Sequence, residues 1–164
     1  MTDVTWNQKV KEALDRTEFM ALSTVTDAQS WISPIAFAYN ETMDLFFISM
    51  IDSRHSQNIL ANPDVSAAIF KTERFPGGDV LGIQLRGIAH HLMQPSDIAE
   101  AAKYYFGRSP SNDEFREETS EKGGADASWQ FFRIRPTEVW CFDSRIFGER
   151  REQVDLKSIH LKLD

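Results

Sequence analysis

The chain has 164 residues, of which 41% are hydrophobic and 26% are charged, so it fits one globular domain with a sizeable buried core. Its net charge of −7 argues against a nucleic-acid-binding protein, because such proteins usually present a basic surface. The single cysteine excludes an internal disulfide, and no apolar run approaches the ~20 residues that span a bilayer. With a polar N-terminus that lacks an apolar signal core, we expect one cytoplasmic domain over residues 1–164 and no membrane segment.

The first part of the chain predicts a helix followed by two paired strands. Thr5 and Gln8 have the spacing of a capping box, and apolar residues follow them at helical spacing. Residues 19–26 and 31–39 then have the composition of strands, with a short polar turn between them. Pro34 lies inside the second strand. Because proline cannot donate to a sheet hydrogen bond, we expect an edge strand or a bulge there.

The next segment is the most informative part of the sequence. A run of apolar and β-prone residues over 45–51 predicts a buried strand, and Asp52 or Ser53 can then cap a helix. Arg54 and His55 fall in the first turn of that helix, where cations oppose the helix dipole unless an anion binds there. Backbone N–H groups, a hydroxyl and a guanidinium together suit a phosphate. The alternative is that both residues are simply solvated, since short turn motifs recur by chance.

The second half of the chain predicts further strands that follow one another mostly as hairpins. In the longest of them, Leu81, Ile83 and Leu85 alternate with Gln84 and Arg86, which predicts one buried and one polar face. The absence of βαβ units favours an antiparallel barrel or sandwich with accessory helices. Strands are expected over 65–71, 81–92, 129–135, 138–143 and from 154 onward, with helices over 53–62 and 95–107 and a short acidic helix from 111, followed by a mobile loop over 122–128.

The order of these elements resembles the pyridoxamine-phosphate-oxidase-like, FMN-binding split barrel, and the resemblance covers roughly residues 19–143. It rests on four segments, 46–59, 62–68, 83–87 and 132–136, taken in this order and spacing. The resemblance implies an α+β fold, an antiparallel split β-barrel of about six or seven strands with a few peripheral helices. It also implies FMN as the cofactor and a homodimer with the flavin at the subunit interface.

The resemblance also implies which residues hold the flavin. Gln84 would hydrogen-bond the edge of the ring, and Phe142 would be donated by the partner chain. The alternatives are purely structural roles, with Gln84 facing solvent and Phe142 in the core. The phosphate residues would be Ser49, Ser53, Arg54 and His55, and the residues beside the ring would be Pro34, Ile35, Ala36 and Phe37.

The chain departs from the dedicated pyridoxamine phosphate oxidases in two places. Residues 144–150 lack their Arg-x-His motif, and Pro34 and Tyr39 replace an Arg and a Lys. We therefore expect an FMN-dependent oxidoreductase acting on another small molecule or electron donor, closer to the short general-stress-type members. The alternative is a non-catalytic flavin- or haem-binding stress or sensor protein. No side chain is singled out as catalytic, and His90 and His91 point to opposite faces of a strand, so no metal site is predicted.

Overall fold

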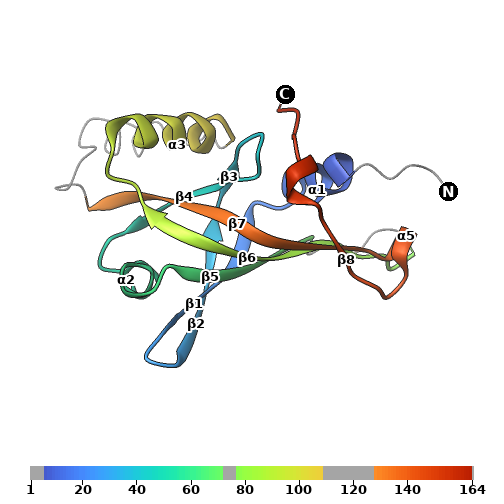
Figure 1. The fold of residues 1–164 in the computed structure, drawn as a ribbon, viewed down its shortest axis with the longest axis horizontal. Coiled ribbons are helices and arrows are strands. Elements are labelled where there is room, and N and C mark those ends of the chain that lie inside the picture. The colour runs from blue at the N-terminus through green and yellow to red at the C-terminus, as the bar shows by residue number, and fades with distance from the viewer. Residues whose placement is uncertain (1–5, 72–76, 109–127, 164) are drawn as a thin grey trace.

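The computed structural model describes residues 6–71, 77–108 and 128–163, which form one curled antiparallel sheet with helices around it (Figure 1). None of the helices in these ranges is long and apolar enough to cross a membrane. The strands are β1 Phe19–Thr26, β2 Gln29–Ala36, β3 Ala38–Tyr39, β4 Leu45–Met50, β5 Asp64–Phe70, β6 Leu81–His91, β7 Trp129–Asp143 and β8 Glu152–Gln153. The helices are α1 Trp6–Asp15, α2 Arg54–Ala61, α3 Pro95–Arg108 and α5 Ser144–Phe147, with a 3-10 helix η1 over Leu156–Ser158.

The strand order explains why the sheet closes on itself. The order is β2-β1-β5-β6-β7-β4-β3, with β8 paired to β7, and every pairing is antiparallel. Only Phe37 separates β2 from β3 along the chain, yet these strands lie at opposite ends of the order. The sheet must therefore curl until its two ends approach each other. This confirms the predicted α+β antiparallel split barrel, and the edge position of β2 accounts for Pro34.

Two apolar clusters lie on opposite faces of the sheet, and β4 contributes to both. Phe47 belongs to the main core, where its ring stacks on Phe132 with the centroids 5.0 Å apart. Phe46 points the other way into a second cluster, where it stacks on Tyr104 of α3 at 5.6 Å. Helix α3 covers this outer face over β3, β4 and β7, while α2 packs on β1, β2 and β6 (Figure 1). Burial on both faces fixes β4, and with it the start of α2.

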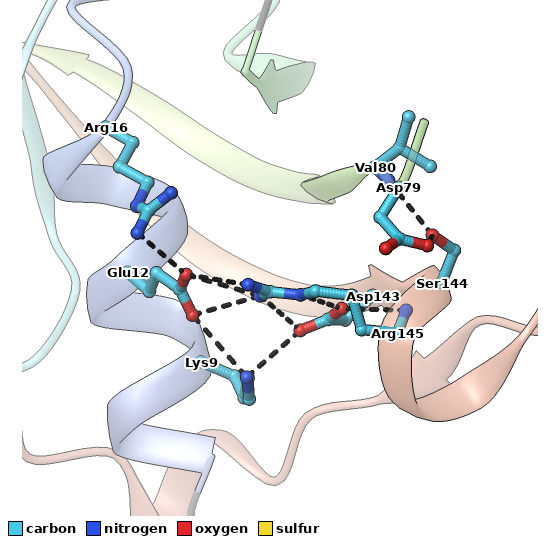
Figure 2. Close-up of polar contacts among 8 residues, drawn as sticks. All are labelled: Lys9, Glu12, Arg16, Asp79, Val80, Asp143, Ser144 and Arg145. Carbon is cyan, nitrogen blue, oxygen red and sulfur yellow. Dashed lines mark hydrogen bonds and ion pairs between the residues drawn. The ribbon is translucent and has the colours of Figure 1, made fainter. Parts of the chain in front are cut away.

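An ion-pair network joins α1 to the end of β7 (Figure 2). The Asp143 carboxylate is fully buried and accepts hydrogen bonds from Arg145 Nη2 at 2.7 Å and Lys9 Nζ at 3.0 Å. Glu12 of α1 contacts the same two cations at 3.1 Å and 3.4 Å, and Arg16 lies 3.3 Å from it. Burial alone would raise the pKa of Asp143, but the hydrogen bonds from Arg145 and Lys9 outweigh burial and lower the pKa.

Three expected elements are present with different bounds. The strand expected over 31–39 is divided at Phe37, because the chain there passes from one end of the sheet to the other. The strand pieces expected on either side of Pro136 form one strand, because Pro136 lies opposite Gly87 at a register shift, an irregularity where a sheet tolerates proline. The turn between β1 and β2 is shorter than expected, because Asp27 and Ala28 adopt positive φ angles of 50° and 59°, as a two-residue hairpin turn requires.

The strand expected from Val154 onward is wrong. In this tail Glu152–Gln153 forms β8 on β7, and Val154 N donates one more bond to Val139 O. The Asp155 side chain then accepts a hydrogen bond from Lys157 N and starts η1. Ile159 and Leu161 still alternate into the core, so the pattern that suggested a strand reflects burial without pairing. The acidic helix expected from 111 and the loop expected over 122–128 lie outside the described residues, except Ser128.

Candidate functional site

A pocket of about 330 Å³ lies between the end of β2 and β4, at the split in the barrel. This volume is at the lower end of the range for small-molecule sites, about 300–1,000 Å³. Six of the predicted flavin-binding residues line it together, although they come from separate parts of the chain. The lining consists of Pro34, Ile35, Ala36, Ile48, Ser49, Met50, Ser53, His55, Tyr105 and Trp129.

Serine hydroxyls surround the His55 ring at the polar end of this pocket. His55 Nε2 lies 2.5 Å from Ser49 Oγ and 3.1 Å from Ser53 Oγ, and these two hydroxyl oxygens are 3.1 Å apart. On the other side of the ring, Nδ1 lies 3.2 Å from Ser33 Oγ of β2. The cluster therefore joins the edge strand β2, the end of β4 and the first turn of α2.

Ser53 holds the cluster in place because it is the N-cap of α2. Its backbone is extended (φ −63°, ψ 150°), and its side chain accepts from Ser56 N at 3.4 Å while donating to Ser56 Oγ at 2.9 Å. The first turn of α2 contains no acidic residue. The positive end of the helix dipole therefore has no anionic side chain of its own helix to interact with, which favours an external anion.

The pocket is electrically neutral at its polar end. Its lining residues include no carboxylate, lysine or arginine, so the titratable side chains of the lining are His55 and Tyr105. Burial lowers the pKa of His55 and raises the pKa of Tyr105, and each shift favours the uncharged form. Hydroxyls, an imidazole and backbone N–H groups can all hydrogen-bond to a phosphate, and no acidic side chain of the lining opposes it.

Arg54 and Phe37 do not line the pocket. The Arg54 guanidinium lies over the Trp31 ring, 4.2 Å from its centroid, so its contact with a phosphate stays a prediction. Phe37 is buried in the main core, where the Arg108 guanidinium lies 4.7 Å from its ring centroid. Its predicted contact with the flavin ring also stays a prediction.

Gln84 and Phe142 lie together on a different part of the sheet. Gln84 accepts a hydrogen bond from Arg151 Nε at 3.0 Å, and the same guanidinium lies 5.4 Å from the Phe142 ring centroid. Phe142 packs against Gly82, where an added Cβ would lie only 2.5 Å from its Cζ. Neither Gln84 nor Phe142 lines the pocket of its own chain. Their contacts with a flavin stay predictions, and the one predicted for Phe142 is with the flavin of a partner chain.

The comparison with family models decides the family. A model described as pyridoxamine 5'-phosphate oxidase matches residues 6–142. The chain belongs to this family. No curated protein matches the sequence.

Solved structures similar to this pyridoxamine 5'-phosphate oxidase family member include both haem-binding and flavin-binding proteins. A haem-binding protein from Mycobacterium smegmatis has a TM-score of 0.73 and 14% identity, covering 96% of this chain and 61% of its own length. A FAD-binding protein from Mesorhizobium loti has a TM-score of 0.65 and 19% identity, and the match covers 92% of this chain and 96% of that protein. HutZ, a haem storage protein from Vibrio cholerae, has a TM-score of 0.61 and 18% identity, and the match covers 80% of this chain and 91% of HutZ. At these identities the likeness shows the shared fold.

The structure adds site residues of this family member that the sequence did not indicate. Ser33 holds His55 from β2, and Tyr105 and Trp129 close the pocket from α3 and β7. Tyr105 and Trp129 have the spacing and composition of ordinary core residues, so no local signal distinguishes them. Ser33 had one usable signal, since strand alternation places it on the same face as the apolar Ile35, and both residues are buried in the structure.

A larger hollow of about 550 Å³ lies on the outer face of β1, β2 and β5 and shares Pro34 with the pocket. Phe19, Ile32 and Phe70 line it, and their exposed fractions are 57%, 65% and 46%. Arg16, Thr17, Glu18 and Lys71 also line the hollow, so exposed apolar residues lie beside charges of both signs. Exposed apolar residues bordered by polar ones are typical of a surface that contacts another protein.

The described residues include no group of three or more His, Cys, Asp or Glu that could hold a metal ion. His91 Nε2 lies 2.9 Å from Gln130 Oε1, while the neighbouring His90 is exposed. Cys141 is buried in the core, and burial raises the pKa of its thiol to about 11, so the thiolate is disfavoured.

Proposed function

We propose that this family member is an FMN-binding flavoprotein, an oxidoreductase that acts on an unidentified small molecule. One observation carries the proposal: residues predicted for the phosphate (Ser49, Ser53, His55) and for the ring (Pro34 to Ala36) line one pocket. The polar residues lie at the end of β4 and the start of α2, and the apolar residues lie on β2, so one ligand with an anionic end and a flat end can contact both.

The donor set fits a phosphate monoester. Ser49 and Ser53 offer hydroxyl donors, and the N-terminus of α2 offers backbone N–H groups. Pro34, Ile35 and Ala36 would lie beside the ring and exclude water, while their backbone groups can hydrogen-bond to it. Bound FMN would supply the redox chemistry, and the protein would anchor its phosphate and tune its potential. We assign no catalytic acid or base among the lining residues.

We propose that the working form is a homodimer. The hollow on β1, β2 and β5, with its exposed Phe19, Ile32 and Phe70, adjoins the pocket through Pro34, so a second copy covering this face would reach the mouth of the pocket. A pocket of about 330 Å³ is small for a complete flavin site, which supports a site completed by another chain. Gln84 and Phe142, which do not line the pocket of their own chain, would then belong to the half-site that the partner provides.

Titration of the protein with FMN and, separately, with riboflavin tests the proposal. Riboflavin carries the same ring without the phosphate. We expect saturable quenching of FMN fluorescence at one FMN per chain and much weaker binding of riboflavin, because the serines and the helix N-terminus bind only the phosphate. Equal affinity for both ligands, or no quenching by either, would refute the proposal.

Two similar structures are haem proteins, which keeps haem storage or binding as a second candidate. The absorbance spectrum separates the candidates. A flavin gives two bands in the near-ultraviolet and blue, and haem gives one dominant Soret band. Titration with haemin that produces a Soret shift, together with no response to FMN, would favour the second candidate.

A further inference from the structure

His55 can gain or lose its positive charge near neutral pH, whereas a lysine or arginine phosphate ligand stays charged. A lysine or arginine brings its charge to an empty site, whereas His55 sits in a cradle without any charged lining residue. Among the lining residues a phosphate dianion would meet dipoles and hydroxyls, and the imidazole is the lining side chain that can add a positive charge by taking up a proton.

The groups around His55 suit both protonation states of the ring. A neutral imidazole donates through one nitrogen and accepts through the other, whereas an imidazolium donates through both. Ser33 Oγ contacts Nδ1, and Ser49 Oγ and Ser53 Oγ contact Nε2. A hydroxyl can donate or accept, so these partners can follow the ring when it gains a proton. A carboxylate in the same place would have fixed the charged form in advance.

The charged and titratable groups on the neighbouring elements leave His55 without a competing charge. The lining residues of β2, β4 and β7 are all uncharged, and α3 contributes the phenol of Tyr105. On the loop before α2 Asp52 is exposed, and on α2 itself Arg54 lies over Trp31. Burial lowers the pKa of His55, so the ring is mainly neutral near pH 7 until an anion contacts it.

We propose that His55 takes up a proton when the phosphate group binds, so that the site binds a phosphate monoester dianion and a proton together. The inference rests on the proposed function and specifies how this chain recognises the phosphate. The bound anion favours the imidazolium, so binding raises the His55 pKa above that of the free protein. Above the second pKa of the phosphate, about 6, affinity for FMN falls as the pH rises from the His55 pKa of the free protein to that of the complex, approaching about tenfold per pH unit.

Isothermal titration calorimetry measures the proton directly. FMN is titrated into the protein slightly above pH 7, where its phosphate (second pKa about 6) is already a dianion, in two phosphate-free buffers with different ionisation enthalpies. The dependence of the observed heat on the buffer gives the number of protons taken up. We expect about one proton taken up per FMN bound for the wild type. Riboflavin is the control ligand and should take up none.

Two variants assign the proton to His55. His55→Gln keeps a polar side chain that cannot titrate, and it should bind FMN more weakly with no proton uptake. His55→Lys supplies a permanent cation, so it should bind FMN with no uptake and with little dependence on pH from about 6 to 8. NMR of the ring nitrogens in the wild-type protein needs no variant and should show the His55 imidazolium only after FMN is added.

The outcomes separate the two proposals. If FMN binds with its phosphate but without proton uptake, or if His55→Gln takes up as many protons as the wild type, the inference is wrong and the proposed function stands. If FMN does not bind at all, the proposed function fails and this inference fails with it. An imidazolium already present in the free protein would also overturn the inference.

Discussion

Ser53 has two roles in the structure, as the N-cap of α2 and as a hydroxyl of the phosphate cradle, and two substitutions separate them. Ser53→Ala removes the acceptor for Ser56 N and the contacts with Ser49 Oγ and His55 Nε2, each at 3.1 Å. Loss of an N-cap costs about 1 kcal/mol of stability. Loss of a hydrogen bond to a charged phosphate costs about 1.5–3 kcal/mol, which weakens FMN binding about 10- to 150-fold.

Ser53→Asp keeps the cap, because aspartate caps helices as well as serine and its charge favours the helix N-terminus. We therefore expect a free energy of unfolding equal to or above that of the wild type. The same carboxylate repels the phosphate. At ~4 Å and an effective dielectric constant of about 20, each pair of unit charges costs about 4 kcal/mol, which weakens FMN binding about a thousandfold or more.

Denaturant unfolding and FMN fluorescence titration measure the two effects on the same samples. Ser96→Asp is a matched control, since Ser96 is an exposed residue in the first turn of α3 and the substitution adds the same charge away from the pocket. That variant should bind FMN like the wild type. The reasoning is refuted if Ser53→Asp binds FMN normally, or if it loses riboflavin as severely as FMN.

Four further substitutions test other parts of the account. Arg54→Ala should weaken FMN binding by about 1.5–3 kcal/mol and leave riboflavin binding unchanged in fluorescence titrations. Unchanged FMN affinity would remove Arg54 from the site. Asp143→Asn should cost about 2–3 kcal/mol in denaturant unfolding at neutral pH, because Lys9 and Arg145 lose a buried partner. Because the folded-state pKa of Asp143 is lowered, this difference should shrink as the pH falls below 3.8, and a pH-independent difference would argue against the ion pairs. Gly82→Ala places a Cβ 2.5 Å from Phe142 Cζ and should cost about 1–3 kcal/mol, whereas Gly107→Ala in α3 meets nothing within 4 Å and should stabilise the protein by up to about 1 kcal/mol.

The parts of the site that the sequence predicted are those set by neighbouring residues. Ser53 caps α2 through a bond to Ser56 N three residues away, so the strand, cap and helix of this segment could be read locally. Pro34 indicated an edge strand because its missing N–H limits where it can pair. Such constraints act within a few residues and therefore leave a mark in the sequence.

The parts that the sequence did not predict depend on contacts between distant elements. Tyr105 and Trp129 reach the pocket because α3 packs on β4 and β7, and nothing near either residue records that packing. The tail after Val154 alternates like a strand because Ile159 and Leu161 are buried, yet burial alone does not supply a partner strand. Arg54 could contact an anion or an aromatic ring. The sequence alone did not indicate that its guanidinium lies over the Trp31 ring.

The central claim is that the cradle of Ser49, Ser53 and His55 binds the phosphate of FMN. A crystal structure of the protein with FMN measures this most directly. We expect the FMN phosphate within hydrogen-bond distance of Ser49 Oγ and Ser53 Oγ, with the flavin ring beside Pro34 to Ala36. A structure in which FMN binds elsewhere, or in which this cradle stays without the phosphate at saturating FMN, would contradict the account.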